Sequence, residues 1–124
     1  MTKILVVDNE QRMCKIIKAG LEMEGHKVDI AYSGEAGIDL LTKKNDYQIV
    51  ITDLRMSGTD GIEVLKRAKK FSTDLEVILI TAFASQQTAI EAMRLGANDY
   101  LIKPFEMDEL SLRVNRIISH KNLS

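Results

Sequence analysis

The sequence has one cysteine, almost no net charge and no long apolar run. A single cysteine, Cys14, excludes a disulfide framework and a thiolate metal site. The 17 basic and 18 acidic side chains give a formal net charge of −1, which indicates neither a nucleic acid nor an anionic membrane as a partner. No apolar run approaches the roughly 20 residues that span a bilayer, and the apolar start is too short for a signal peptide. We therefore expect a reduced, cytoplasmic domain that contacts neither nucleic acid nor membrane directly.

What the sequence does contain is the composition of one globular domain. Its 124 residues are 45% hydrophobic and 28% charged, which excludes disorder and low-complexity polymer. We find no internal repeat and no interdomain linker. The sequence therefore predicts a single domain over residues 1–120, followed by a polar tail over residues 121–124, where a linker would begin.

Five short runs rich in Ile and Val alternate with longer segments whose apolar residues recur at helical spacing. Branched apolar runs of this length favour β-strands, and the longer segments favour amphipathic helices. Strict alternation of strand and helix is typical of a parallel α/β fold. The predicted strands cover residues 4–7, 28–31, 49–51, 77–80 and 100–102.

Small residues mark the ends of several predicted helices. Ser33 and Ser85 stand where N-caps are expected. Gly25 and Gly96 follow helical segments, at the position where a left-handed residue closes a helix. These caps place the helix boundaries between the predicted strands.

The character of each strand predicts its place in the sheet. The first, third and fourth runs are continuously apolar, as in strands covered on both faces. The second run alternates polar and apolar residues and the fifth is short, so both fit sheet edges. Right-handed crossovers then favour a single doubly wound five-stranded parallel sheet in the order 2-1-3-4-5, with helices on both faces. The winding reverses between strands one and three, so a site is expected at their carboxyl ends.

Polar side chains follow four of the five predicted strands. Strand one is followed by Asp8-Asn9-Glu10, strand three by Asp53, strand four by Thr81, and strand five by Lys103. These strands are contiguous in the predicted order, and the carboxyl ends of parallel strands meet at one edge. Any one of these residues alone would be an ordinary cap, turn or surface group, but their convergence predicts a site.

The residue types at this edge suit phosphoryl transfer. A carboxylate such as Asp53 can attack phosphorus and form an aspartyl phosphate. Clustered carboxylates repel one another unless a cation lies among them, and such oxygen ligands suit Mg²⁺. A lysine ammonium and a threonine hydroxyl can bind the oxygens of the transferring group.

Four short motifs resemble the receiver domain of two-component response regulators. They are Val6-Val7-Asp8, Ile51-Thr52-Asp53-Leu54-Arg55-Met56, Ile80-Thr81-Ala82 and Lys103-Pro104-Phe105, and the match covers nearly the whole chain. The resemblance implies a phospho-acceptor switch, in which Asp53 takes a phosphoryl group from the phosphohistidine of a histidine kinase with Mg²⁺ as cofactor. It implies a signalling domain, with only intrinsic autophosphorylation and autodephosphorylation chemistry, rather than an enzyme.

The resemblance also implies individual roles. Asp8 and Asp53 would belong to the metal pocket, together with the backbone carbonyl of Arg55. Thr81 and Lys103 would hold the phosphoryl oxygens.

Tyr100 matches the family's switch aromatic, which turns inward when the threonine moves toward the phosphate. Simple packing against the sheet remains an equal alternative for Tyr100. The peptide bond before Pro104 is often cis in the family.

One position departs from the family pattern. Receiver domains usually have two consecutive acidic residues after strand one, and the second position here is Asn9. This position normally supplies a direct carboxylate ligand of Mg²⁺. An amide oxygen can coordinate Mg²⁺ but adds no charge. We therefore expect the site with Asn9 still to bind Mg²⁺, with lower affinity. Glu10 is expected to be solvated in the first turn of the following helix.

The same motifs look like receivers of the nitrogen-regulation type. The implied partners are a histidine kinase and a downstream effector domain or protein. The resemblance also allows a homodimer on phosphorylation and a role in transcription regulation. The alternative is a degenerate receiver that binds partners without phosphorylation, which Asn9 alone favours. A dehalogenase-like phosphatase is disfavoured because Arg55 stands where it needs a second aspartate, and a flavodoxin because Asp8 and Glu10 would repel the flavin phosphate.

Other residues have plainer interpretations. Cys14 is expected to be a small buried residue rather than a reactive thiol. We assign no function to His26 or His120, which lack metal-ligand spacing. The methionines are interpreted as core filler; they are Met13, Met23, Met93 and Met107.

Overall fold

Strands and helices alternate along the chain from its beginning. The computed structural model describes the backbone of residues 2–44, 46–56, 58–82 and 85–123, and the side chains of these residues up to Lys121. Within this part of the chain the elements are β1 (Lys3–Val7), α1 (Gln11–Met23), β2 (Lys27–Ala31), α2 (Gly34–Lys44), β3 (Ile49–Asp53), α3 (Gly61–Phe71), β4 (Glu76–Thr81), α4 (Gln86–Arg94), β5 (Asp99–Ile102) and α5 (Met107–Leu123).

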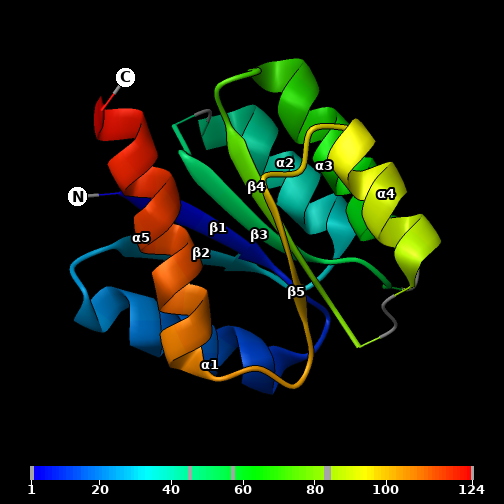
Figure 1. The fold of residues 1–124 in the computed structure, drawn as a ribbon. Helices are drawn as coiled ribbons and strands as arrows, with labels where there is room; N and C mark the ends of the chain where they lie inside the picture. The colour runs from blue at the N-terminus through cyan, green and yellow to red at the C-terminus, as the bar shows by residue number, and fades with distance from the viewer. Residues whose placement is uncertain (1, 45, 57, 83–84, 124) are drawn as a thin grey trace.

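The five strands form one parallel sheet in the order β2-β1-β3-β4-β5, which confirms the predicted topology. In register, Val6 pairs with Ile51, and Thr52 pairs with Leu79. The central strand β3 is buried along its whole length, as its continuous apolar run predicts. Because the strands are parallel, their carboxyl ends all lie at the same edge of the sheet (Figure 1).

Helices cover both faces of the sheet. In Figure 1, α1 and α5 lie on one face and α2, α3 and α4 on the other. Successive residues of a strand point to opposite faces, so Ile49 and Ile51 pack under α1 and α5, while Val50 packs with the other layer. Two separate apolar cores result, one on each face of the sheet.

The predicted caps are confirmed where the structure describes them. The Ser33 hydroxyl accepts a hydrogen bond from the Ala36 N–H at 3.1 Å, and the Ser85 hydroxyl caps α4. Gly25 and Gly96 have φ values of 91° and 101°, a left-handed conformation that other residues rarely adopt.

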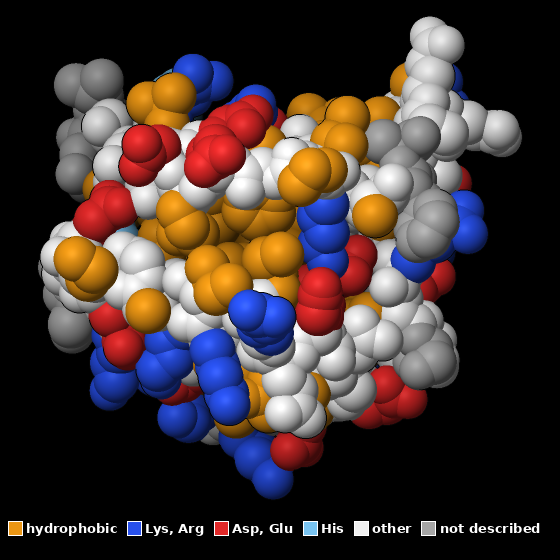
Figure 2. Space-filling model, turned by 90° about the horizontal axis from the view of Figure 1, so that it is seen from below, with side chains coloured by type: hydrophobic (Ala, Val, Ile, Leu, Met, Phe, Trp, Pro, Cys, Tyr) orange, Lys and Arg blue, Asp and Glu red, His pale blue; other side chains and the backbone are white. Residues whose placement is uncertain are grey.

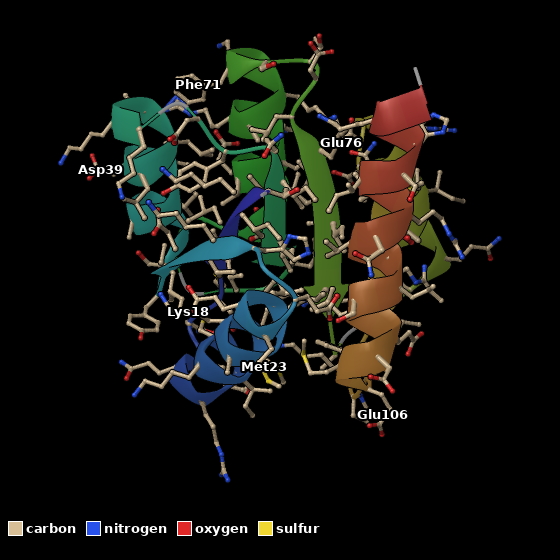
Figure 3. All side chains as sticks on the ribbon, turned by 90° about the vertical axis from the view of Figure 1, so that its left-hand side faces the viewer. Lys18, Met23, Asp39, Phe71, Glu76 and Glu106 are labelled. Atoms are coloured by element: carbon tan, nitrogen blue, oxygen red, sulfur yellow. The ribbon has the colours of Figure 1, made fainter. Side chains whose placement is uncertain are left out.

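Helix α5 continues through Leu123, and within it Lys121 donates to the Asp74 carbonyl at 2.8 Å. One sequence expectation differs from the structure. The expectation that all four methionines fill the core is wrong for Met23 and Met93, which are 89% and 50% exposed. Met23 lies about 200° around α1 from the buried Leu21, and Figure 3 shows it on the outside of that helix.

A helix that crosses a bilayer needs about 20 predominantly apolar residues. None of the helices in this part of the chain is both long and apolar enough to cross a bilayer.

Candidate functional site

Four polar side chains meet at the carboxyl edge of the sheet. Asp8 directly follows β1, Asp53 ends β3, Thr81 ends β4, and Lys103 directly follows β5. Asp8 and Thr81 are completely buried, and Asp53 is 8% exposed. Polar side chains this deeply buried need hydrogen-bonding partners. The ammonium of Lys103 is the partner of both carboxylates.

Lys103 joins two carboxylates that are far apart in the sequence. Its Nζ lies 3.0 Å from Oδ2 of Asp8 and 3.1 Å from Oδ2 of Asp53. Its backbone N–H donates to the carbonyl of Thr81 at 2.8 Å, which fixes the start of the loop after β5. The bond from Lys103 to Pro104 is cis. The structure therefore brings together Asp8, Asp53 and Lys103, as the sequence predicts.

The backbone around Asp8 is held by several hydrogen bonds. The Asp8 N–H donates to the Ala31 carbonyl at 3.1 Å. The Cys14 thiol donates to the Asp8 carbonyl at 3.2 Å, and the Glu10 N–H donates to Oδ1 of Asp8 at 2.9 Å. These hydrogen bonds orient the carboxylate of Asp8 without the help of a ligand.

Asp53 is fixed by the turn that follows β3. The Arg55 N–H donates to Oδ1 of Asp53 at 3.3 Å, while Oδ2 faces Lys103. A Cβ on Gly61 would lie 2.1 Å from the carbonyl oxygen of Asp53, so only glycine allows α3 to begin this close to the strand. The start of α3 therefore closes the loop around Asp53.

Burial and charge shift the pKa values of this site. Burial raises the pKa of the Asp53 carboxyl, and the Asp8 carboxylate raises it further, although Lys103 acts in the opposite direction. Burial alone would lower the pKa of Lys103, but its contacts with Asp8 and Asp53 outweigh burial and raise it. Lys103 is therefore a cation at neutral pH, and Asp53 is more basic than an ordinary aspartate.

Several oxygen atoms at this edge are of the type that binds a hard cation. The carboxylates of Asp8 and Asp53 and the carbonyl of Arg55 would supply oxygen ligands, the type that Mg²⁺ prefers. Asn9 is exposed beside them and adds an amide instead of a third acid. Among the described residues, no group of three or more His, Cys, Asp or Glu side chains could hold a metal ion. Two carboxylates and one backbone carbonyl are oxygen ligands of the type that Mg²⁺ accepts, with water at its other positions.

Tyr100 lies on β5, beneath α4. Its ring is partly buried and packs against the core of the α3 and α4 face, and its hydroxyl lies 3.2 Å from Oγ1 of Thr88. Sequence reasoning missed Thr88, although Ser85 and Thr88 have the spacing of a capping box, which could have identified it.

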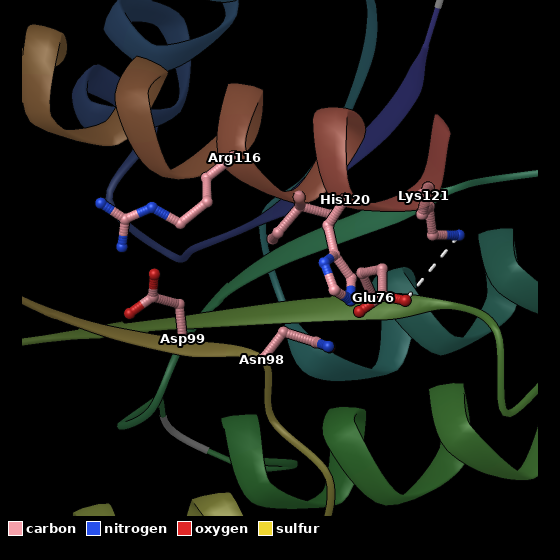
Figure 4. Close-up of a pocket in the computed structure, with 7 residues that line it drawn as sticks. Glu76, Asn98, Asp99, Arg116, His120 and Lys121 are labelled. Atoms are coloured by element: carbon pink, nitrogen blue, oxygen red, sulfur yellow. Dashed lines mark ion pairs between the residues drawn. The ribbon is translucent and has the colours of Figure 1, made fainter. Parts of the chain in front are cut away.

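Two other features of the surface are an apolar patch and a cavity under α5. Seen from below, hydrophobic side chains gather in the middle of the face, with acidic and basic groups around them (Figure 2). A cavity of about 350 Å³ lies under the second half of α5, where Lys121 pairs with Glu76 (Figure 4). Glu76 and Asp99, which line it, begin β4 and β5, so this cavity is at the opposite edge from Asp53.

Comparison with known proteins decides the family. A profile of the response regulator receiver domain matches residues 4–115. The chain belongs to this family. It is a receiver domain of the kind found in two-component response regulators.

Two curated relatives show what kind of protein carries a similar receiver domain. The chain is 40% identical over 121 residues to transcriptional regulatory protein ZraR of Klebsiella oxytoca. It is 36% identical over 123 residues to regulatory protein AtoC of Escherichia coli strain K12. These matches cover 98% and 99% of this receiver domain but 27% and 26% of the relatives, so the chain spans about a quarter of their length. Both relatives support the predicted nitrogen-regulation type.

A solved structure agrees with the fold throughout its length. The response regulator receiver domain protein from Clostridium thermocellum superposes with a TM-score of 0.91 at 36% identity. The match covers 99% of this receiver domain and 98% of that chain. The predicted doubly wound architecture is confirmed by this likeness as well as by the strand order.

Proposed function

We propose that this receiver domain is a phospho-acceptor switch that takes a phosphoryl group from a histidine kinase onto Asp53. One observation carries the proposal: a single ammonium, Lys103, bridges the carboxylates of Asp8 and Asp53 at an edge where Thr81 also ends its strand. A nucleophile, a cation and a hydroxyl at one edge are the groups that phosphoryl transfer needs.

The reaction follows from the contacts of Asp53. A carboxylate oxygen attacks phosphorus, the bond between phosphorus and the imidazole nitrogen of the donor breaks, and the imidazole leaves with that electron pair. The Arg55 N–H holds Oδ1 of Asp53, so this carboxylate is oriented within the site. Lys103, already 3.1 Å from Oδ2, stabilises the negative charge on the transferred group, and the Thr81 hydroxyl holds one of its oxygens.

Mg²⁺ is the cofactor we propose for this step. Asp8, Asp53 and the carbonyl of Arg55 would hold it, with Asn9 as a neutral neighbour. When bound, the ion supplies positive charge that offsets the charge on the phosphoryl oxygens. Because Asn9 brings no charge, the affinity for Mg²⁺ should be lower than that of a site with a third acid.

Phosphorylation is proposed to change a surface rather than release a product. Thr81 and Tyr100 would shift together and alter the face formed by α4, β5 and α5. An effector domain or partner protein, or a second copy of the chain, would read that face. The name of transcriptional regulatory protein ZraR suggests that the output regulates transcription.

A second function is favoured by Asn9 and by the lack of a three-acid group among the described residues. In this alternative the chain is a degenerate receiver that binds partners without phosphorylation. It predicts equal partner binding by the wild type and by Asp53→Ala.

The test is intact mass after incubation with a small-molecule phosphodonor, with and without Mg²⁺. We expect the wild type to gain one phosphoryl group only with Mg²⁺, and Asp53→Asn to gain none. Asp39→Asn is the matched control, because Asp39 lies on the exposed side of α2, paired only with Lys43 among the described residues. A folded wild type that gains no mass at high Mg²⁺ would favour the phosphorylation-independent alternative.

A further inference from the structure

The cavity under the second half of α5 lies at the edge of the sheet where the strands begin, opposite the phospho-acceptor. Its volume of about 350 Å³ is within the range of small-molecule sites. Arg116, Ile117 and His120 line it from α5, and Figure 4 shows Arg116 and His120 reaching from the helix toward the strands. Asn98 and Asp99 line it from the start of β5. The cavity therefore shares no wall residue with the phosphorylation site.

The two carboxylates on the cavity wall already have cations of their own. Oδ1 of Asp99 pairs with the guanidinium of Arg113, one turn before Arg116 on α5. Oε1 of Glu76 lies 3.9 Å from Nζ of Lys121. The negative charges of the wall are therefore balanced within the protein.

Arg116 and His120 bring further polar groups to the cavity from one face of α5, because they are four residues apart. Neither side chain makes an ion pair or a hydrogen bond with another residue that the structure describes. The side-chain carbonyl of Asn98 accepts from the Val77 N–H at 2.8 Å, so its amide N–H groups remain as donors. Within the described residues, the cavity thus offers unpartnered N–H groups and one positive charge without a counterion.

We propose that this cavity binds a small organic acid that carries one carboxylate. The planar guanidinium of Arg116 presents parallel N–H groups that match the two oxygens of a carboxylate. The Asn98 amide and the His120 ring supply further donors for the same anion, and Ile117 offers an apolar contact for the body of the acid.

The charges of the wall favour a monoanion over a dianion. One uncompensated guanidinium balances one carboxylate, whereas Glu76 and Asp99 would repel the second charge of a dianion such as doubly ionised phosphate. The inference does not depend on the proposed function, because the cavity and the phospho-acceptor lie at opposite edges of the sheet.

The site is tested by NMR titration of the isotope-labelled protein with benzoate, a rigid monocarboxylate with an apolar ring. We expect saturable shifts of the amide signals of Asp99 and Ile117 and of the side-chain Nε–H signal of Arg116. The dissociation constant should be on the order of millimolar, because a probe of about nine non-hydrogen atoms gains limited binding free energy. The amides of α2, on the other face of the sheet, should not shift.

Variants of exposed residues separate the site from general damage to the fold. Arg116→Gln removes the charge and the fork and should weaken benzoate binding at least about ten-fold, whereas Arg116→Lys keeps the charge alone and should fall between this variant and the wild type. His120→Ala removes one neutral donor and should weaken binding about two- to ten-fold. Arg12→Gln is the matched control, because Arg12 is exposed on α1 and has no ion pair with another described residue. It should bind benzoate as the wild type does.

Matched probes test the chemistry of the ligand. Benzamide has the same ring without the charge and should bind at least about ten-fold more weakly than benzoate. Inorganic phosphate and chloride, each at the same ionic strength, should give no saturable shift at Asp99 or Ile117. Benzamide or phosphate that binds as tightly as benzoate would overturn the assignment to a monocarboxylate. No saturable shift with benzoate, or equal benzoate affinity of Arg116→Gln and the wild type, would overturn the site itself.

Discussion

At the scale of single residues, the site is governed by the balance of charge around Lys103. Asp8 and Asp53 contribute two negative charges and Lys103 one positive charge, all within 3.1 Å contacts. Asn9, exposed at the mouth of the site, leaves this balance one negative charge short of the usual receiver pattern. The same substitution that weakens attraction for a cation also reduces repulsion in the metal-free protein.

Replacing Asn9 by aspartate should therefore strengthen cation binding. We expect Asn9→Asp to lower the dissociation constant for Mg²⁺ at least about five-fold, because an added ligand charge is worth on the order of 1 kcal/mol or more at short range. Isothermal titration of the unphosphorylated protein with Mg²⁺ measures it. Ser119→Asp adds the same charge at an exposed position of α5 and should leave the affinity unchanged. Equal affinities for Asn9→Asp and the wild type would contradict the assignment of position 9 to the metal pocket.

The contacts of Asp29 with Tyr47 and Lys44 make the free energy of unfolding depend on pH. Tyr47 donates to Oδ2 of Asp29 at 2.6 Å, and Lys44 lies 3.2 Å from the same oxygen. Burial alone would raise the pKa of Asp29, but these two contacts outweigh burial and lower it. A carboxyl whose pKa is lowered by folding stabilises the protein above its unfolded pKa, and the stabilisation is lost as pH falls through the folded value.

Removing the Tyr47 hydroxyl should weaken this dependence. On acidification from about pH 6 to about pH 3, the wild type should lose about 1 kcal/mol more unfolding free energy than Tyr47→Phe. Urea unfolding at the two pH values measures the difference, with Tyr32→Phe as control. If both proteins lose the same stability, Asp29 does not contribute in this way.

At the scale of elements, each helix can be judged by what it buries. Helix α1 turns Cys14, Ile17 and Leu21 inward, and burial together with the Asp8 carboxylate raises the pKa of the Cys14 thiol to about 12. Cys14 thereby becomes a reporter of whether α1 stays docked on the sheet. This agrees with the expectation that it is a buried residue without reactivity.

Alkylation of Cys14 should therefore be slow in the native protein. At mildly alkaline pH we expect a rate on the order of a thousandfold below that of the urea-unfolded chain, because three pKa units reduce the thiolate fraction by that factor. Timed alkylation followed by mass measurement gives both rates. A native rate within tenfold of the unfolded one would mean that α1 opens readily.

Elements with strong local signals were predictable from the sequence. The apolar runs gave the strands to within one or two residues, and Ser33, Ser85, Gly25 and Gly96 marked helix ends correctly because capping depends on neighbouring residues. The convergence of Asp8, Asp53 and Lys103 was predictable because parallel strands share one carboxyl edge.

Features that depend on distant packing were not predictable. The contact between Tyr100 and Thr88 joins two elements, and no local pattern specifies it. The exposure of Met93 follows from how α4 sits on the sheet, and residue type alone suggests burial.

At the scale of the whole molecule, the polar site and the apolar cores lie in different parts of the fold. The reacting groups lie at the carboxyl edge, two apolar cores hold the helices on either face, and α4 is held by less buried surface than α3. We propose that a change of charge at Asp53 alters the face that includes α4 and leaves the two cores in place. The account rests on Asp53 being the residue that receives the phosphoryl group.

The most direct test of that claim locates the modified residue. The protein is incubated with a small-molecule phosphodonor and Mg²⁺, treated with borohydride, which reduces an aspartyl phosphate to homoserine, and then digested for peptide mass analysis. We predict homoserine at position 53 alone, and none when Mg²⁺ is withheld. Homoserine at Asp8 or another carboxylate, or at no position in a folded, Mg²⁺-saturated protein, would contradict the account.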